Sequence, residues 1–158
     1  MSGGPCDDQT MSTPTTTPTA ADVAVDFLTA MARGDADAAI ALLHPDIVYT
    51  NVGLPTLRHA GTVTVLRGLD GPVGFGVRFL NVSADGDTIL TERIDELSLG
   101  WFHWQFWVCG SFEIRDGLVV GWRDYFDNLH MARKFVRALV AVVLPSSQRP
   151  LPAPRPMG

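Results

Sequence analysis

Leu90-Thr-Glu-Arg-Ile-Asp-Glu-Leu97 is a predicted strand that carries two opposite charges at alternate positions. Side chains two residues apart in a strand point to the same face of the sheet, so Arg93 and Asp95 share a face. The other residues of that row are mostly apolar: Ile89, Thr91 and Leu97. We therefore expect the charged pair to lie on the face that turns toward the protein interior.

A second acid lies on the last predicted strand, in Gly121-Trp-Arg-Asp-Tyr-Phe-Asp127. Alternation places Asp124 in a row of apolar side chains: Leu118, Val120, Trp122 and Phe126. A carboxylate in apolar surroundings is costly unless a cation pairs with it, and Arg93 is the candidate partner. The two strands predict an Asp–Arg–Asp site inside an apolar pocket.

The elements around these strands follow an order typical of an α+β fold. The expected order is helix 19–34, helix 35–44, strand 46–51, helix 61–69, strands 76–84, 88–97, 101–114 and 118–126, and helix 128–144. Asp85-Gly86 and Asp116-Gly117 are hairpin signals. The last helix should cover the mouth of the sheet or pack in a subunit interface. We expect helices on one side of a strongly curved, mixed or antiparallel sheet, a cone whose apolar interior suits a small hydrophobic ligand.

Composition indicates one globular domain over residues 20–144. Hydrophobic residues make up 46% of the chain and charged residues 18%, an ordinary balance for such a domain. Residues 1–19 are rich in Ser, Thr, Pro and Gly and are expected to be a disordered tail. Residues 145–158 are expected to be a proline-rich tail.

Charge and motif content argue against several classes of function. The net charge of −5, without a basic stripe, argues against nucleic acid as a partner. The cysteines and histidines show no metal-ligand spacing, so a metal site is not expected. No secretory signal is visible, and no apolar run approaches the roughly 20 residues of a membrane span. A cytoplasmic protein is the expectation.

The three charged residues together suggest acid–base catalysis. Burial raises the pKa of both carboxyls, Arg93 lowers both, and the like charge of each neighbour separates them. One carboxylate and one carboxylic acid can then coexist near neutrality, as a base and an acid on opposite sides of a bound molecule. Arg93 keeps its proton, so its role would be to bridge and orient. The alternative is an ordinary cross-strand salt bridge, worth little at a surface.

Tyr49 and Asn51 share one face of the strand over residues 46–51 and form a second candidate group. A phenol and an amide supply donors and acceptors that could hold a water molecule. The alternative is a tyrosine at the rim and an asparagine that begins a turn. The aromatic residues could be core or pocket lining, and the sequence leaves this open: Phe75, Phe79, Trp101, Trp104, Phe106, Trp107, Phe112, Trp122 and Phe126.

Four segments, in this order and spacing, resemble the limonene-1,2-epoxide hydrolase family, most closely its actinobacterial, mycobacterial-type branch. They are Val48-Tyr-Thr-Asn-Val-Gly53, Leu90-Thr-Glu-Arg-Ile-Asp95, Val108-Cys-Gly-Ser-Phe-Glu113 and Trp122-Arg-Asp-Tyr-Phe-Asp127. The resemblance implies the cone-shaped α+β fold of the nuclear-transport-factor-2-like (NTF2-like) superfamily and a homodimer. It also implies cofactor-independent hydrolysis of a hydrophobic epoxide to a vicinal diol, in one step and without a covalent intermediate.

The resemblance also assigns a role to each candidate residue. Asp124 would match the base that deprotonates the attacking water, and Tyr49 and Asn51 the residues that hold this water. Asp95 would match the acid that protonates the epoxide oxygen, and Arg93 the bridge between the acids. The departures from the family, the two tails and the Trp101 and Trp104 pair, leave the size of the substrate open.

Two other functions remain open at this point. One is proton transfer on carbon, as in ketosteroid isomerases or polyketide cyclases of the same fold, which use a carboxylate base and an oxyanion site. An arginine between two acids is not needed for that reaction. The other is a non-catalytic module that binds an apolar ligand, because one fold hosts many functions.

Overall fold

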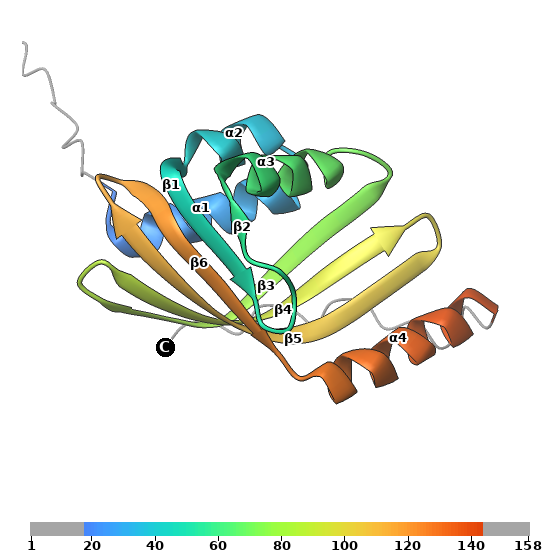
Figure 1. Ribbon diagram of the computed structural model, residues 1–158. Helices are drawn as coiled ribbons and strands as arrows, with labels where there is room; N and C mark the ends of the chain where they lie inside the picture. The colour runs from blue at the N-terminus through green and yellow to red at the C-terminus, as the bar shows by residue number, and fades with distance from the viewer. Residues whose placement is uncertain (1–17, 144–158) are drawn as a thin grey trace, which may run out of the picture.

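The computed structural model describes residues 18–143, in which helices pack on a strongly curved, open sheet (Figure 1). The elements are α1 (Ala20–Ala32), α2 (Ala36–Ala41), β1 (Leu43–Asn51), β2 (Leu57–Arg58), α3 (His59–Gly68), β3 (Val73–Asp85), β4 (Thr88–Leu99), β5 (Phe102–Arg115), β6 (Leu118–Phe126) and α4 (Asn128–Val143). The strand order is β2-β1-β6-β5-β4-β3. Strand β1 runs parallel to β6, and the other neighbouring pairs are antiparallel. The predicted α+β class with a mixed sheet is confirmed.

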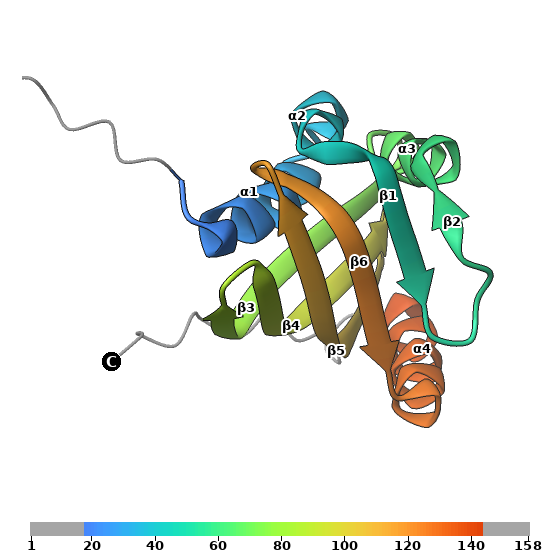
Figure 2. The same ribbon diagram turned by 60° about the vertical axis from the view of Figure 1, so that its left-hand side comes forward.

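Helix α1 supplies a large part of the hydrophobic core and packs on strands β3 to β6 (Figure 2). A capping box fixes its start: the Thr19 hydroxyl accepts from the Asp22 backbone N–H, and the Asp22 carboxylate accepts from the Thr19 backbone N–H. Its apolar face includes Phe27 and Leu28, which are fully buried. The helix ends before Gly34, whose φ of +69° suits glycine. The predicted position of this helix is confirmed.

The region between α1 and β3 differs from the prediction. The expected helix over 35–44 ends at Ala41, and β1 begins at Leu43 rather than at residue 46. Leu43 pairs with Val119 of β6, and the Val119 N–H donates to the carbonyl of Leu42, so tertiary pairing extends the strand. Strand β2 was not predicted, because a pair of residues shows no periodicity.

A β-bulge in β6 changes one predicted row of side chains. The register between β5 and β6 shifts between Glu113 and Ile114. Val119 is therefore fully buried, whereas the prediction placed Val120 on the inner face. An extra residue in one strand shifts the alternation of side chains by one position. The predicted inner row is therefore wrong for the residues before the bulge and correct for those that follow it. Trp122 and Asp124 are both buried.

Helix α4 packs against β5, far from α2 and α3 (Figure 1). The Trp104 indole N–H donates to the carbonyl of Met131 at 3.2 Å, and the Phe135 ring lies 5.2 Å from the Trp104 ring. No helix within residues 18–143 is long and apolar enough to cross a membrane. The predicted tails lie outside the described residues, apart from positions 18 and 19.

Candidate active site

The guanidinium of Arg93 lies at the centre of the candidate site and is completely buried. Its Nε donates to both carboxylate oxygens of Asp95, at 2.9 Å and 3.1 Å. Its Nη2 donates to Oδ1 of Asp124 at 2.7 Å. The structure therefore brings together the three charged residues that the sequence placed on one face of the sheet.

Strand register explains how Arg93 reaches an acid 31 positions later in the chain. Gly110 of β5 pairs with Thr91 of β4 on one side and with Asp124 of β6 on the other. A Cβ atom at position 110 would lie 2.7 Å from Oγ1 of Thr91 and 3.0 Å from Oδ1 of Asp124, and would collide with Nη1 of Arg93. Glycine at this position leaves the space through which the guanidinium crosses the middle strand.

Tyr49 and Asn51 enter the site from β1, the parallel neighbour of β6. Asn51 pairs in register with Asp124, and the Tyr49 ring stacks on Trp122 at 3.8 Å. The Asn51 side-chain N–H donates to the Tyr49 hydroxyl at 2.6 Å. Oδ1 of Asn51 is buried and accepts no hydrogen bond from the described residues. The pair thus lies beside Asp124 with an acceptor available for a bound molecule, and Tyr49 does not lie at a solvent-exposed rim.

Burial gives the two acids an unusual affinity for protons. It raises the pKa of Asp95 to about 6, against the lowering effect of Arg93, and the negative charge of Asp124 adds to the rise. Burial also raises the pKa of Asp124, while the charge and the hydrogen bond of Arg93 oppose that rise. Both carboxyls therefore bind a proton more tightly than a free aspartate does, and the negative charge of one opposes ionisation of the other.

The burial of the three charged side chains excludes a surface salt bridge. The side chains of Arg93, Asp95 and Asp124 are 0%, 5% and 4% exposed, so the surface alternative is wrong. A buried ion pair adds little net stability, since desolvation offsets the attraction between the charges. Buried acids with shifted pKa values are typical of functional sites.

The sheet face around the acids is apolar in both directions along the strands. Toward the hairpin between β5 and β6, Phe112 and Trp122 pack against Phe27 of α1 at 6.3 Å and 5.1 Å. Toward α4, Phe106 lies directly opposite Asp95, and its ring is 5.8 Å from that of Phe126. The acids therefore sit between the main core and a second aromatic group.

The other predicted aromatic residues divide between core and surface. Phe75 and Phe79 are partly buried and pack against the main core. Trp101 is 81% exposed, and Trp107 lies on the outer face, where its indole N–H donates to Glu92 at 3.0 Å. His103 is partly exposed and contacts Glu96, so it is a surface histidine as expected.

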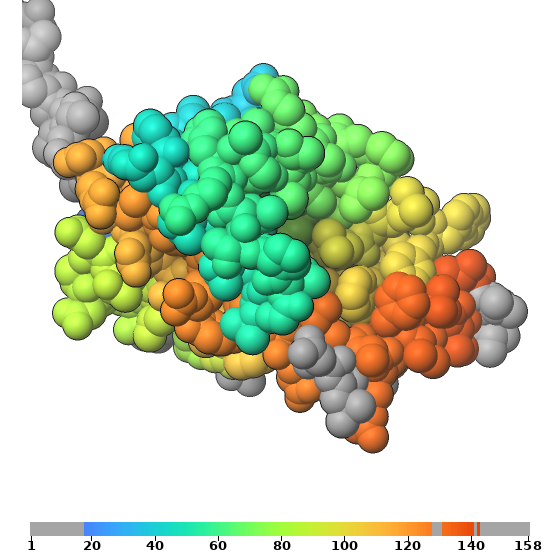
Figure 3. Space-filling model, in the orientation of Figure 1, coloured from blue at the N-terminus to red at the C-terminus, as the bar shows by residue number. Residues whose placement is uncertain are grey.

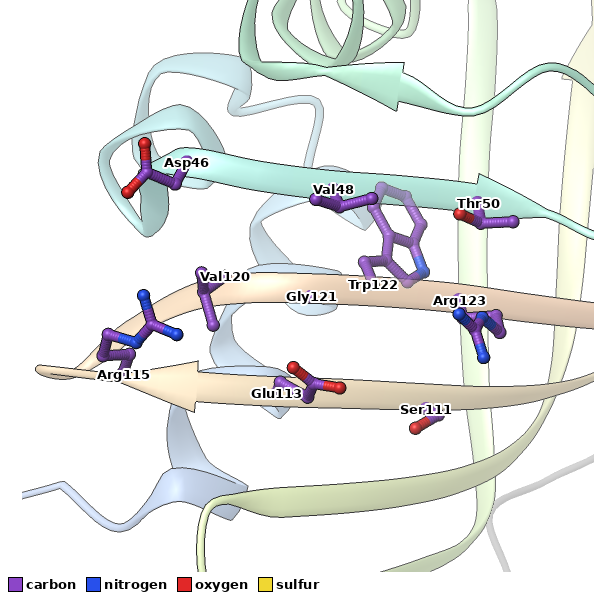
Figure 4. Close-up of a pocket in the computed structure, with 10 residues that line it drawn as sticks. All are labelled: Asp46, Val48, Thr50, Ser111, Glu113, Arg115, Val120, Gly121, Trp122 and Arg123. Carbon is purple, nitrogen blue, oxygen red and sulfur yellow. The ribbon is translucent and has the colours of Figure 1, made fainter.

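A groove of about 320 Å³ lies on the opposite face of the sheet, across β1, β6 and β5 (Figure 4). Its lining includes Thr50, Ser111 and Arg123, which alternate with the residues of the buried site. This groove therefore does not give access to the two acids. Within the described residues, no group of three or more His, Cys, Asp or Glu could hold a metal ion.

Sequence reasoning missed the roles of Thr91 and Gly110. Thr91 was counted only as a member of the inner row, yet its Oγ1 accepts from Nη1 of Arg93 at 3.0 Å. Gly110 stood within the segment 108–113, noted for its resemblance, but without a function. Both roles depend on the register between β4, β5 and β6, and the periodicity of a single strand does not reveal that register.

Comparison with known proteins identifies relatives across most of the chain. The model of the limonene-1,2-epoxide hydrolase catalytic domain matches residues 18–137. The chain is 47% identical over 121 residues to epoxide hydrolase EphG of Mycobacterium tuberculosis, a match that covers 76% of this chain and 81% of the relative.

Solved structures agree with that assignment. An M. tuberculosis LEH-like epoxide hydrolase superposes with a TM-score of 0.80 and 44% identity, covering 84% of this chain and 95% of the other. A putative polyketide cyclase from Xanthomonas campestris pv. campestris gives a TM-score of 0.65 at 19% identity, covering 73% and 96% of the two chains. NTF2-like proteins of unknown function are also among the neighbours. At these low identities the likeness shows the fold alone, and it confirms the predicted NTF2-like architecture.

Proposed function

Since this chain belongs to the limonene-1,2-epoxide hydrolase family and is an epoxide hydrolase, we propose that it adds water to a hydrophobic epoxide in one step. Asp124 acts as general base, Asp95 as general acid, and Arg93 holds the two in place. The observation that carries this proposal is the buried guanidinium bonded to both acids, at 2.9 Å and 2.7 Å.

The reaction begins with a water molecule beside Asp124. The Asn51 carbonyl oxygen lies next to this acid and is suited to accept from the water's second hydrogen, and the Tyr49 hydroxyl is suited to donate to the water's oxygen. Burial raises the pKa of Tyr49, and the charge of Asp124 adds to the rise. The phenol therefore stays neutral and keeps its O–H group as a hydrogen-bond donor. Two contacts and one acid would thus fix the direction of attack.

Bond making and bond breaking are coupled through the two acids. The water oxygen attacks an epoxide carbon while Asp124 takes one of its protons, and the carbon–oxygen bond breaks as Asp95 protonates the leaving oxygen. The product is a vicinal diol, and the enzyme is left with a protonated Asp124 and an ionised Asp95. Proton exchange with solvent restores the starting state. Each proton transfer contributes roughly 10²–10⁴-fold to the rate.

Epoxide opening by this route requires no metal and no organic cofactor, because proton transfer and water positioning supply its chemistry. We propose a small or medium apolar epoxide as substrate, since the face around the acids is aromatic on both sides. The homodimer implied by the resemblance stays a prediction, which sedimentation velocity of the full chain can check.

A panel of terpene, styrene, fatty-acid and sterol epoxides in ¹⁸O-labelled water tests the function. We expect at least one member to give a vicinal diol with a single ¹⁸O atom, because the water oxygen attacks directly. Chiral analysis of the diols would add which carbon is attacked. A covalent ester intermediate on an aspartate would instead leave unlabelled oxygen in the diol of the first turnover.

Other outcomes of the same panel would favour the alternative functions. No diol from any epoxide, together with deuterium incorporation next to the carbonyl of a ketone substrate in D₂O, would favour proton transfer on carbon, which the cyclase-like fold could host. Binding of epoxides without any turnover would favour a non-catalytic module.

A further inference from the structure

The inner face of the sheet is closed on the α1 side of the two acids. Phe27 and Phe112 are fully buried, and Trp122 is 4% exposed. Their rings are in mutual contact, with centroids 5.1 Å to 6.3 Å apart. Side chains packed at this density leave no room for the body of a substrate.

On the other side of the acids the same face continues as a second aromatic group, formed by Trp104, Phe106, Phe126 and Phe135. Phe106 lies opposite Asp95 in the register of β4 and β5, and Phe126 follows Asp124 by two positions. Trp104 lies 4.9 Å from Phe106, and Phe135 of α4 lies 5.2 Å from Trp104. Phe106 is buried but does not belong to the main core cluster.

This second aromatic group is more exposed to solvent than the main core is. Phe135 is 40% exposed and Trp104 is only partly buried. Figure 3 shows the surface hollowed between the green residues of α3, the yellow residues of β4 and β5, and the red-orange residues of α4. A molecule that places its oxirane between the two acids must direct its apolar part toward this side.

We propose that the substrate carries a flat, unsaturated ring, which lies against Trp104, Phe106 and Phe126 while the oxirane reaches the acids. This inference rests on the proposed function and adds a substrate class to it. Neighbouring rings of the group meet edge-on or tilted, with centroids 4.9 Å to 5.8 Å apart, a geometry that a further aromatic ring can join. Such a ring contact favours an aromatic over a saturated ring by about 2- to 10-fold.

The test compares two epoxides that differ only in the ring: benzyloxirane and (cyclohexylmethyl)oxirane. A methylene group separates ring and oxirane in both, so their intrinsic reactivity is similar. We expect wild-type kcat/KM to favour the phenyl compound by about 2- to 10-fold. In Trp104→Leu and Phe106→Leu this ratio should fall toward one. Trp107→Leu, on the outer face of the same strand, is the matched control and should keep the wild-type ratio.

Each outcome separates the substrate class from the proposed function. Turnover of both epoxides with a wild-type ratio near one would overturn the aromatic subsite and leave the hydrolase in place. A preference that survives in both inner-face variants would also overturn it. Failure to hydrolyse any epoxide would count against the function itself. Trp104 is only partly buried, so its variant remains informative if Phe106→Leu fails to fold.

A second inference concerns the hydrogen-bond partners that hold the Arg93 guanidinium in place. Each of its three nitrogens donates to a different side chain: Nε to Asp95, Nη2 to Asp124 and Nη1 to Thr91. The Thr91 hydroxyl in turn donates to the carbonyl of Gly110 at 3.4 Å, and Thr91 is 1% exposed. Of these three acceptors, the Thr91 hydroxyl is the neutral one and the other two are carboxylates. Together they fix the orientation of the guanidinium.

We infer that Thr91 and Gly110 are positioning residues, which hold Arg93 at the distance that sets the proton affinities of the two acids. Thr91→Val keeps the shape but removes the acceptor, whereas Thr91→Ser keeps the hydroxyl. We expect Thr91→Val to lower kcat by about 10-fold with little change in KM, because one charge-assisted hydrogen bond is lost. Thr91→Ser should stay within about 3-fold of wild type.

The pH profile distinguishes positioning from a purely structural role. A guanidinium displaced from this position lowers the pKa values of the two acids less than it does in the wild type. The alkaline limb of the kcat/KM profile should therefore move to higher pH in Thr91→Val and in Gly110→Ala. A structural role would reduce the yield or Tm and leave this limb in place. A Thr91→Val enzyme with a wild-type profile, or a Thr91→Ser enzyme as impaired as Thr91→Val, would refute the inference.

Discussion

Asp124→Asn is expected to lower kcat for epoxide hydrolysis by about 10³-fold, because it removes the base that takes the proton of the attacking water. The asparagine amide has the size of the carboxylate. In the wild type, Nη2 of Arg93 lies 2.7 Å from Oδ1 of Asp124, and the amide oxygen of the variant can accept the same hydrogen bond. Binding of the apolar epoxide should therefore persist. Single-turnover kinetics and equilibrium dialysis with the preferred epoxide would measure the two effects separately.

The control for this variant is Asp116→Asn, at the hairpin between β5 and β6. Asp116 is exposed, and its φ of +52° suits asparagine, so the same change of charge occurs away from the site. Its activity should equal that of wild type. Residual activity of Asp124→Asn within about 10-fold of wild type would exclude the proposed base.

The geometry of the acid site was predictable because it depends on two alternating rows. The spacing of Arg93 and Asp95 places them on one face of any strand, and Asp124 lies after the bulge, where alternation holds again. A buried carboxylate without a partner is too costly to persist, which led to Arg93 before any register was known. The α+β class followed in the same way from the order of helices and hairpin signals.

Features that depend on how strands pair were not predictable in this way. The bulge that buries Val119, the extension of β1 to Leu43 and the role of Gly110 all depend on the partner strand. A sequence pattern gives the face of a residue but not its neighbour across the sheet. For the same reason the sequence could not say that Phe112 belongs to the core while Phe106 borders the acids.

The proton affinity of Asp95 gives the second large effect. With a pKa raised to about 6, Asp95 carries its proton below that pH and loses it above. If it is the general acid, kcat/KM should fall by about 10-fold per pH unit on the alkaline side. Asp95→Asn should lower kcat by about 10²- to 10⁴-fold and abolish this limb, because the amide supplies no transferable proton. Initial rates across the pH range for both enzymes measure this, and a fully active Asp95→Asn would remove the proposed acid.

Protein stability provides an independent measure of the same proton. The folded-state pKa of Asp95 lies above that of an unfolded aspartate, so the folded protein binds more protons between about pH 4 and about pH 6. The free energy of unfolding should therefore be greatest at the acidic end of that window and decrease as the pH rises through it. The difference due to Asp95 is on the order of 3 kcal/mol, and Asp124 contributes with the same sign. Urea unfolding at both ends of the window should show a smaller decrease in Asp95→Asn. A decrease across this window that is as large in Asp95→Asn as in wild type would mean that Asp95 is not the acid that holds the proton.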